Sequence, residues 1–272
     1  MTNSNTRERY FELCNYMERL PVFNNSQDNN KSIQILNSKV NAYSVDGIIE
    51  LINEGLAKNE PIRISCLNSN KLYEMNNNSY INDIVNESFL VIPDGYSIVI
   101  GTKILHGKKI DRITGIDLMN SFINYANNNG KSIYLLGSSE KTVNKAYQNV
   151  ISNYPRITVY KHNGYFDVKE MNELTNELLA IKPDIIFIGI SSPLKEYLMN
   201  YLQSKGIKSV ILGVGGSFEV LANNKKRAPL FIQKIGMEWL FRVVQEPKRL
   251  FKRYLICNSD FAYRIVKEKV KQ

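Results

Sequence analysis

Apolar and polar positions along this chain fall into two alternating patterns. From about residue 33, short runs of consecutive apolar residues alternate with longer stretches whose apolar positions recur at helical spacing. Continuous apolar runs predict strands at 61–68, 88–94, 131–139, 184–191 and 208–216, and one more at the start of 156–166. Amphipathic spacing predicts helices at 45–58, 115–130, 140–155, 168–183 and 194–206. Strands that alternate with helices of this length predict an α/β fold, a parallel sheet with helices on both faces.

The ends of the predicted strands give the first indication of a site. These strands are apolar throughout, as expected when helices cover both faces of the sheet. Ligands of such sheets bind beyond the carboxyl ends of the strands. Those ends are Asn68, Asp94, Gly137, His162, Ser191 and Gly215.

Two segments depart from the alternating pattern. Residues 1–31 include the polar run NNSQDNNK, which cannot pack a core, so we expect a short helix and a flexible link there. From Lys225 onward the pattern becomes basic and aromatic helix. The chain is therefore predicted to comprise an N-terminal extension (1–31), an α/β domain (32–224) and a helical C-terminal appendage (225–272).

The net charge is concentrated in this appendage. Of the 35 Lys and Arg residues, 13 lie from Lys225 onward, together with 4 of the 26 Asp and Glu residues. Residues 1–224 therefore carry 22 charges of each sign, and the whole excess of +9 lies in the last segment. A basic segment on a neutral body predicts an anionic partner: phosphate groups, nucleic acid or a membrane surface.

Composition argues against several classes of protein. No run of about 18 apolar residues is present, so we expect no membrane-spanning helix, and the polar N-terminus is unlike a secretory signal. Cys14, Cys66 and Cys257 are far apart and form no CxxC pair, and two histidines are too few for a histidine-rich metal site. A reducing cytoplasm therefore fits best, with neither a disulfide framework nor a zinc site.

The stretch VIPDGYSIVIG (91–101) sets one carboxylate at the end of an apolar run, in front of a glycine that suits a tight turn. One interpretation is that Asp94 caps the following turn. The other is that Asp94, at the ligand edge of the sheet, accepts a proton from a substrate hydroxyl as a general base. No histidine or cysteine lies in a convincing nucleophile motif, which leaves the acids as the better candidates.

Glycine-rich turns follow two of the predicted strands, in GSSE (137–140) and GVGGSF (213–218). Turns of this kind expose backbone N–H groups near a helix start and suit phosphate, although each can equally be a tight connection. Neither is a GxGxxG fingerprint and no GK[ST] phosphate loop occurs, so a Rossmann oxidoreductase is disfavoured. Together the turns favour a nucleotide site without naming the nucleotide.

The appendage interleaves basic residues with apolar and aromatic ones, namely Trp239, Leu240, Phe241, Leu250, Phe251 and Tyr254. Such a segment can be a solvated helix face, an oligomer contact, a pyrophosphate site or an attachment to anionic lipid. Nucleic acid is the less favoured partner, because there is one short patch and no recognised nucleic-acid module. Whether the protein is a homo-oligomer stays open.

Taken together, the motifs resemble those of one family. The order PDG, DRITGIDL, LLGSSE, HNGYF, KPDIIFIGISSPLKE, GVGGSFEVLANNKKRAP and MEWLFRVVQEPKRLFKRY is similar to that of the WecG/TagA/CpsF glycosyltransferases, glycosyltransferase family 26. The resemblance runs from about residue 38 to 256. Its most specific part is the C-terminal signature RAP, EWLxR and EPxRLxxRY.

The resemblance implies an inverting transferase that uses no metal and no cofactor. Such an enzyme moves a sugar from a UDP-sugar to a polyprenyl-diphosphate-linked sugar at the cytoplasmic membrane face, in teichoic acid or other surface-polysaccharide synthesis. The implied sugar is N-acetylmannosamine or a related N-acetylhexosamine, with UDP-glucose or a UDP-uronic acid as alternative donors. The implied fold is Rossmann-like, of the type called GT-E, with an appendage that completes the active site and reaches the membrane. A nucleotide-binding protein whose basic tail holds nucleic acid is the non-enzyme alternative.

The same resemblance implies roles for residues at the predicted edge of the sheet. Asp94 matches the family's proposed base, and Arg112 matches the arginine of its RxxG motif. Asn68 matches the second member of an upstream Thr-x-Asn pair, in which Cys66 replaces the threonine. Both Asn68 and Cys66 are therefore expected at the substrate.

In the appendage, Arg242 and Arg249 match arginines that would neutralise the departing diphosphate. Besides Cys66, three positions of the α/β domain depart from the family pattern: Lys195 stands for a glutamine, Glu219 for an aspartate and Asn223 for a glycine. Asn tolerates the left-handed backbone that a glycine suggests. The lysine could pair with a carboxylated sugar, pair with diphosphate or point at solvent. The remaining positions expected to bind UDP or sugar are Gly137, Gly189, Lys195, Glu196, Gly215, Gly216, Glu219 and Lys252.

Overall fold

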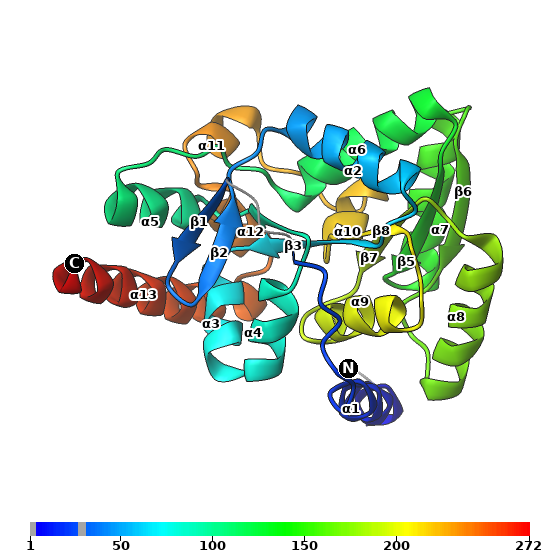
Figure 1. Cartoon of the computed structure of the whole chain (residues 1–272), viewed down its shortest axis with the longest axis horizontal. Helices are drawn as coiled ribbons and strands as arrows, with labels where there is room; N and C mark the ends of the chain where they lie inside the picture. The colour runs from blue at the N-terminus through cyan, green and yellow to red at the C-terminus, as the bar shows by residue number, and fades with distance from the viewer. Residues whose placement is uncertain (1–3, 27–30) are drawn as a thin grey trace.

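A six-stranded parallel sheet forms the centre of the molecule (Figure 1). The computed structural model describes residues 4–26 and 31–272. The strands lie in the order β4-β3-β8-β7-β5-β6, and every neighbouring pair is parallel. Their bounds are β3 Ile62–Leu67, β4 Leu90–Pro93, β5 Ser132–Gly137, β6 Thr158–His162, β7 Ile185–Gly189 and β8 Val210–Gly213. The predicted α/β class is confirmed, and each predicted strand is present.

Helices cover both faces of this sheet, and each face has its own apolar core. One core lies under α2 Val45–Ala57, α6 Gly115–Asn129, α7 Glu140–Asn153 and α10 Ser217–Leu221. The other lies under α1 Ser4–Met17, α3 Ser69–Asn77, α4 Ser79–Asn86, α8 Val168–Ile181 and α9 Leu194–Ser204. Successive residues of a strand point to opposite faces, so Ile133 joins the first core and Tyr134 the second.

Local sequence explains where the helices begin and end. Asp167 and Glu170 form a reciprocal capping box at the start of α8. Thr114 caps α6 by accepting a hydrogen bond from the backbone N–H of Asp117, at 3.2 Å. The same helix ends at Gly130 as predicted, with that glycine in the left-handed region at φ +59°.

Three features near the N-terminus were not predicted. A hairpin, β1 Ser32–Ile35 and β2 Ser38–Asn41, precedes the main sheet. Helix α1 is the expected short helix, but Met17 on it is fully buried in the core shared with α9. The buried Arg63 also donates 2.9 Å from Nη2 to the backbone oxygen of Phe23. Residues 4–26 are thus attached to the α/β domain through Met17 and Phe23, and of the residues 1–31 in which a flexible link was expected, 1–3 and 27–30 lie outside the described residues.

The C-terminal segment forms three helices: α11 Leu230–Lys234, α12 Glu238–Gln245 and the long α13 Pro247–Lys271. Helix α13 packs against α3 and α5 Tyr96–His106, the latter another helix that was not predicted (Figure 1). Gly101 of α5 permits this contact, because a Cβ there would lie 2.7 Å from the Phe261 ring. Among the described helices, none is both long enough and apolar enough to cross a bilayer.

Candidate active site

Asp94 follows directly after β4, at the carboxyl edge of the sheet. Both of its carboxylate oxygens accept hydrogen bonds, Oδ1 from the backbone N–H of Gly115 at 2.9 Å and Oδ2 from Asn68 Nδ2 at 3.1 Å. Gly115 is the first residue of α6, so the carboxylate lies against the positive end of that helix. Two donors fix the direction of the carboxylate, and its remaining lone pairs stay available for a substrate.

Asp94 does not cap the turn that follows it. Helix α5 begins after Gly95 without any side-chain capping bond. Gly95 has an ordinary φ of −88°, so it is not required for its backbone conformation. It is required for space, because a Cβ at this position would lie 2.7 Å from the Cβ of Asn68. The glycine therefore lets β4 approach Asn68 closely enough for the bond between Asn68 and Asp94.

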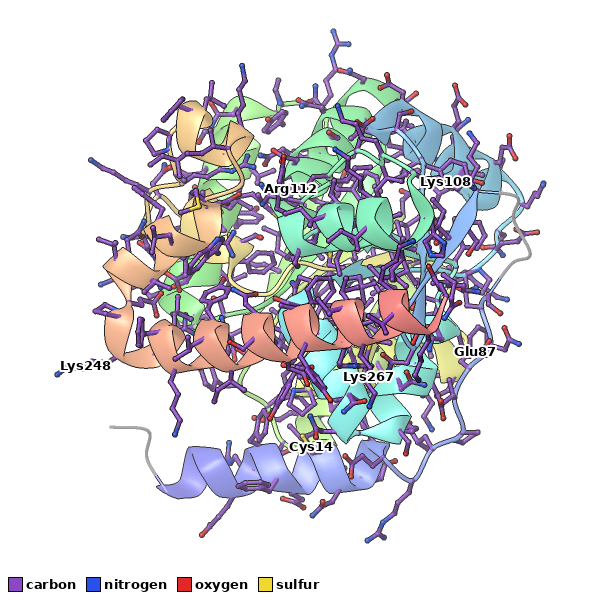
Figure 2. The ribbon with its side chains drawn as sticks, turned by 90° about the vertical axis from the view of Figure 1, so that its left-hand side faces the viewer. Cys14, Glu87, Lys108, Arg112, Lys248 and Lys267 are labelled. Carbon is purple, nitrogen blue, oxygen red and sulfur yellow. The ribbon has the colours of Figure 1, made fainter. Side chains whose placement is uncertain are left out.

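Arg112 links this carboxylate turn to the C-terminal segment (Figure 2). Its Nε donates to the backbone oxygen of Asp94 at 2.9 Å, and its Nη2 donates to Glu238 Oε2 at 2.7 Å. Glu238 is the first residue of α12, and its side chain is only 4% exposed. A buried ion pair thus joins residues 126 positions apart in the sequence.

Glu238 is the centre of a cluster of guanidinium groups. Its other oxygen lies 3.2 Å from Arg242 Nη2 and 3.8 Å from Arg227 Nε. Burial acts to raise the pKa of Glu238, but the bond from Arg112 and the charges of Arg242 and Arg227 bring it below its ordinary value. One buried carboxylate is therefore held ionised by three arginines, one before β5 and two in the C-terminal segment.

Arg227, in the RAP motif, fixes the start of the C-terminal segment to α6. It makes a two-pronged pair with Asp117, with Nη1 to Oδ1 at 2.6 Å and Nη2 to Oδ2 at 2.7 Å. Asp117 also accepts from the Thr114 hydroxyl at 2.6 Å. Burial raises the pKa of Asp117, but bonds from Arg227 and Thr114 leave it below its ordinary value.

Arg242 is the appendage arginine that the fold brings toward Asp94. Desolvation acts to lower its pKa, but the negative charges of Glu238 and Asp94, with Tyr254, leave that pKa raised. About half of its side chain remains exposed, so the guanidinium can still meet a ligand. Arg242 thus lies within electrostatic reach of the carboxylate at the sheet edge.

Arg249 and Lys252 lie farther along α13. Arg249 donates from Nε to Glu246 Oε2 at 2.5 Å, and Glu246 also pairs with Lys225. Lys252 is exposed. Their neighbour Lys248 lies at the far end of α13 from Lys267, at the margin of Figure 2. Their expected contact with the diphosphate remains a prediction.

A second cluster of charges lies beneath β3 and β8. Lys195 Nζ lies 3.1 Å from Glu196 Oε1, and Lys71 Nζ lies 2.8 Å from the same oxygen. Burial raises the pKa of Glu196, but these two lysines outweigh it and lower the pKa to about 2. Of the alternatives for Lys195, solvent is wrong, because its side chain is only 12% exposed.

Cys66 lies beside this cluster. Burial, followed by the charge of Asp94, raises the pKa of its thiol to about 12. The Sγ lies 3.5 Å from the backbone oxygen of Gly213, to which it donates. Cys66 is thus a neutral thiol and not an activated nucleophile, and its expected position at the substrate remains a prediction.

The glycine-rich strand ends lie side by side on the neighbouring strands. Gly137 and Gly189 are paired in register between β5 and β7, and a Cβ on Gly137, whose φ is +138°, would lie 2.5 Å from the Gly189 carbonyl carbon. The N–H groups of Ser138 and Gly215 donate to carbonyls of β7, at 3.1 Å each. Those two donors serve the fold, so the expected phosphate binding at the turns remains a prediction.

Residues 215–223 comprise the short helix α10 with a turn at each end, and they lie next to the start of α7. Gly215 and Gly216 precede α10, and Glu219 on that helix accepts from the Thr142 hydroxyl at 3.2 Å. Glu219 therefore lies near the glycine turn after β5. Asn223 has a φ of +56°, which confirms the expectation of a left-handed backbone at this position.

Sequence reasoning missed Glu238, Arg227 and Lys71. Glu238 and Arg227 stand in the quoted motifs EWLxR and RAP, but their partners Arg112 and Asp117 lie more than 100 residues away in the sequence. A buried carboxylate needs a nearby cation. The glutamate at the start of the largely apolar motif EWLxR was therefore the available indication of an ion pair. Lys71 carries no comparable signal.

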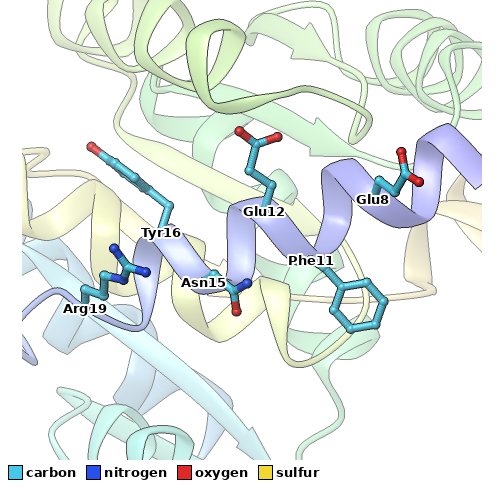
Figure 3. Close-up of a pocket in the computed structure, with 6 residues that line it drawn as sticks. All are labelled: Glu8, Phe11, Glu12, Asn15, Tyr16 and Arg19. Carbon is cyan, nitrogen blue, oxygen red and sulfur yellow. The ribbon is translucent and has the colours of Figure 1, made fainter.

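A surface hollow lies apart from the candidate residues. It lies along the exposed face of α1, and six residues of that one region line it: Glu8, Phe11, Glu12, Asn15, Tyr16 and Arg19 (Figure 3). None of the candidate residues lines it. Within the described part of the chain, no group of three or more His, Cys, Asp or Glu side chains could hold a metal ion.

Comparisons with known proteins agree on one family. Residues 33–272 match the sequence model of the glycosyl transferase WecG/TagA/CpsF family. The N-acetylglucosaminyldiphosphoundecaprenol N-acetyl-beta-D-mannosaminyltransferases of Staphylococcus aureus strains MW2 and COL are each 31% identical to this chain over 199 residues. These alignments cover 73% of this chain and 77% of each relative.

Proposed function

Because the chain belongs to the WecG/TagA/CpsF family of glycosyltransferases, we propose that it transfers an N-acetylhexosamine, N-acetylmannosamine first among them, from a UDP-sugar. The proposed acceptor is a sugar linked to polyprenyl diphosphate, in cell-wall or teichoic acid synthesis. The similar S. aureus proteins are named for an N-acetylmannosaminyl transfer to N-acetylglucosaminyldiphosphoundecaprenol. The same fold with UDP-glucose or a UDP-uronic acid is the alternative.

One observation carries the chemistry: an oriented carboxylate at the ligand edge of the sheet. Asp94 accepts bonds from Asn68 and from the start of α6, which leaves it directed and able to accept a proton. In the proposed reaction the acceptor hydroxyl oxygen bonds to the anomeric carbon and its proton passes to Asp94. The bond from that carbon to the diphosphate oxygen breaks, UDP leaves with the electron pair, and the configuration inverts.

The departing diphosphate needs positive charge. Arg242 is the cation best situated for this role, because it is partly exposed and lies within electrostatic reach of Asp94. Arg112 acts as a positioning residue, since its guanidinium is taken up by the Asp94 backbone and Glu238. Arg249 and Lys252 are proposed to contribute only when a ligand draws α13 toward the edge.

The ion pair of Lys195 supports a neutral donor sugar over a uronic acid. Its ammonium is already paired with the buried Glu196, whose charge is shared with Lys71. A sugar carboxylate would have to compete with that internal pair in a site of low dielectric. N-acetylmannosamine carries no carboxylate, so it does not compete with Glu196 for the Lys195 ammonium.

The enzyme is proposed to act at a membrane surface, because the acceptor carries a lipid. The outward side of α13 supports this, since it alternates basic with apolar side chains. Its exposed residues include Lys248, Phe251, Lys252, Leu255, Tyr263, Val266, Lys267 and Val270. Basic side chains interleaved with aromatic and aliphatic ones suit the surface of an acidic bilayer.

A donor screen tests the proposed function. Purified protein is mixed with a short-chain polyprenyl-diphosphate N-acetylglucosamine and one of four donors: UDP-N-acetylmannosamine, UDP-N-acetylglucosamine, UDP-glucose or UDP-glucuronic acid. The proposal predicts acceptor-dependent UDP release that is greatest with UDP-N-acetylmannosamine. Release with UDP-glucuronic acid alone would contradict the assignment of the donor, and no release with any donor would contradict the activity.

A further inference from the structure

Helix α5 carries an apolar face that the body of the protein does not cover. It begins directly after Asp94 and Gly95 and runs from Tyr96 to His106. Its inner face is buried against β1, β4 and α13. On its outer face, Ile100 and Ile104 are 47% and 44% exposed, in line with the exposed ring of Tyr96. Side chains four residues apart form one continuous stripe on a helix.

This stripe continues onto neighbouring parts of the C-terminal segment. Gly236, after α11, lies against the Tyr96 ring, where a Cβ would be 2.7 Å from the ring carbon Cγ. Helix α11 exposes Leu230 and Phe231, and Ile235 directly after it is exposed as well. Figure 2 shows α5 directly above α13, with α11 and α12 on the same side of the molecule. Apolar side chains exposed on one face by several adjacent helices mark an interaction surface.

The charges around the stripe are predominantly positive. Residues 96–110 contain Lys103, Lys108 and Lys109 and no acid, and α11 adds Lys234. The first half of α13, residues 247–259, has four basic residues and no acid, and the second half, which packs on α5 through Phe261 and Ile265, has four basic residues and two acids. A two-fold pairing of this surface with a second copy would set like charges against each other, which disfavours a dimer through it. An acidic lipid surface offers both the opposite charge and an apolar layer.

We propose that α5, a helix of the α/β domain itself, inserts the stripe Tyr96–Ile100–Ile104 into the surface of an acidic bilayer, beside α13. This inference rests on the proposed function, since it supposes a lipid-linked acceptor. Its consequence concerns the carboxylate. Helix α5 begins next to Asp94 and spans about 16 Å over its 11 residues, so docking through α5 holds the sheet edge at the membrane surface.

The test compares two double variants on vesicles. Ile100→Gln/Ile104→Gln removes the stripe, and Leu179→Gln/Tyr165→Gln makes a matched change at exposed positions near α8, on the opposite side of Figure 1. Binding to vesicles of equal phosphatidylglycerol and phosphatidylcholine is measured by sedimentation. We expect the α5 variant to bind about tenfold or more weakly than wild type, while the control binds normally. The reason is that the variant no longer gains the free energy of transferring two half-exposed isoleucine side chains from water into the bilayer. Equal binding of the two variants would overturn the proposal.

Two further measurements separate this inference from the proposed function and from misfolding. UDP release with a short-chain, water-soluble acceptor should be unchanged in the α5 variant, because it needs no membrane. If wild type itself gave no release, the proposed function would fail, while the vesicle comparison would still decide the role of α5. Ile104→Cys labelled with an environment-sensitive fluorophore should shift to the blue on the same vesicles. No shift at this single site would contradict insertion even if the double variant failed to fold.

Discussion

At the scale of single residues, the candidate site is a set of polar side chains fixed by distant partners. Asp94, Asn68 and Arg112 could be named from the sequence, because each stands in a short motif or at a predicted strand end. Their partner Glu238 could not be paired with Arg112, since the contact depends on how the C-terminal segment crosses the sheet edge. Sequence thus indicated the candidate base more readily than the residues that hold it.

Replacing Glu238 tests whether this buried carboxylate organises the arginines. Glu238→Gln leaves Arg112, Arg227 and Arg242 without their shared negative partner, so we expect a loss of about 2–4 kcal/mol in the free energy of unfolding. Glu246→Gln is the matched control, because its pair with Arg249 is largely exposed and should cost less than about 1 kcal/mol. Urea unfolding measures both. Equal losses would show that Glu238 has no organising role.

The ionisation of Glu196 makes the free energy of unfolding depend on pH. Its pKa in the folded protein is about 2, below the ordinary 4.5, so its ionised form stabilises the fold at pH values above 4.5. That contribution is lost progressively as the pH falls from 4.5 toward 2. The free energy of unfolding of wild type should therefore exceed that of Glu196→Gln at pH 6 to 7, and the difference should shrink between pH 4.5 and 3. A difference independent of pH would contradict the assignment.

At the scale of elements, helices with strong local signals were predicted and those without them were missed. Helix α6 has a Thr cap and a Gly stop, and both appear in the sequence. Helix α5 has no side-chain cap, and its isoleucines point both inward and outward, which obscures the helical period. The short, Asn-rich α3 and α4 were likewise missed, because polar helices of 9 and 8 residues depend on packing against α13 and α9.

Adding a single methyl group at Gly101 should disturb the packing of α13 on α5. A Cβ at Gly101 would lie 2.7 Å from Phe261 Cζ and 3.1 Å from Ile265 Cδ1. We expect Gly101→Ala to lower the free energy of unfolding by about 1–3 kcal/mol through overpacking, although alanine is the better helix former. Limited proteolysis should also cut α13 sooner. Gly47→Ala, in the first turn of α2, serves as the control, because a Cβ there would come no closer than 3.3 Å to a neighbouring atom. An equal effect of both changes would count against close packing at α5.

At the scale of the whole molecule, the sequence located the excess positive charge in the C-terminal segment but did not predict the surface that this segment forms with α5. Counting charges separated a neutral 1–224 from a basic C-terminal segment. It could not show that α13 lies along α5, nor that the two helices share an exposed apolar face (Figure 2). Those features arise from long-range packing, which no local pattern contains. The basic appendage is thus one side of a surface that the α/β domain completes.

This surface predicts binding to vesicles that depends on salt. Wild-type protein should sediment with phosphatidylglycerol-containing vesicles at low ionic strength, and more weakly at 0.5 M NaCl, because salt screens exposed charges over about 8–10 Å and less at higher concentration. Pure phosphatidylcholine vesicles should bind it poorly. Equal binding to neutral and acidic vesicles at both salt concentrations would remove the electrostatic part of the account.

The central claim is that the Asp94 carboxylate accepts the proton of the attacking hydroxyl. The most direct measurement is the turnover of Asp94→Asn in acceptor-dependent UDP release, with Asp111→Asn, an exposed acid of the following loop, as the control. Asparagine keeps the size of the side chain, so we expect an intact fold and a kcat about 10²–10⁴-fold lower, while the control stays near wild type. An Asp94→Asn protein that turns over at a nearly normal rate would contradict the claim.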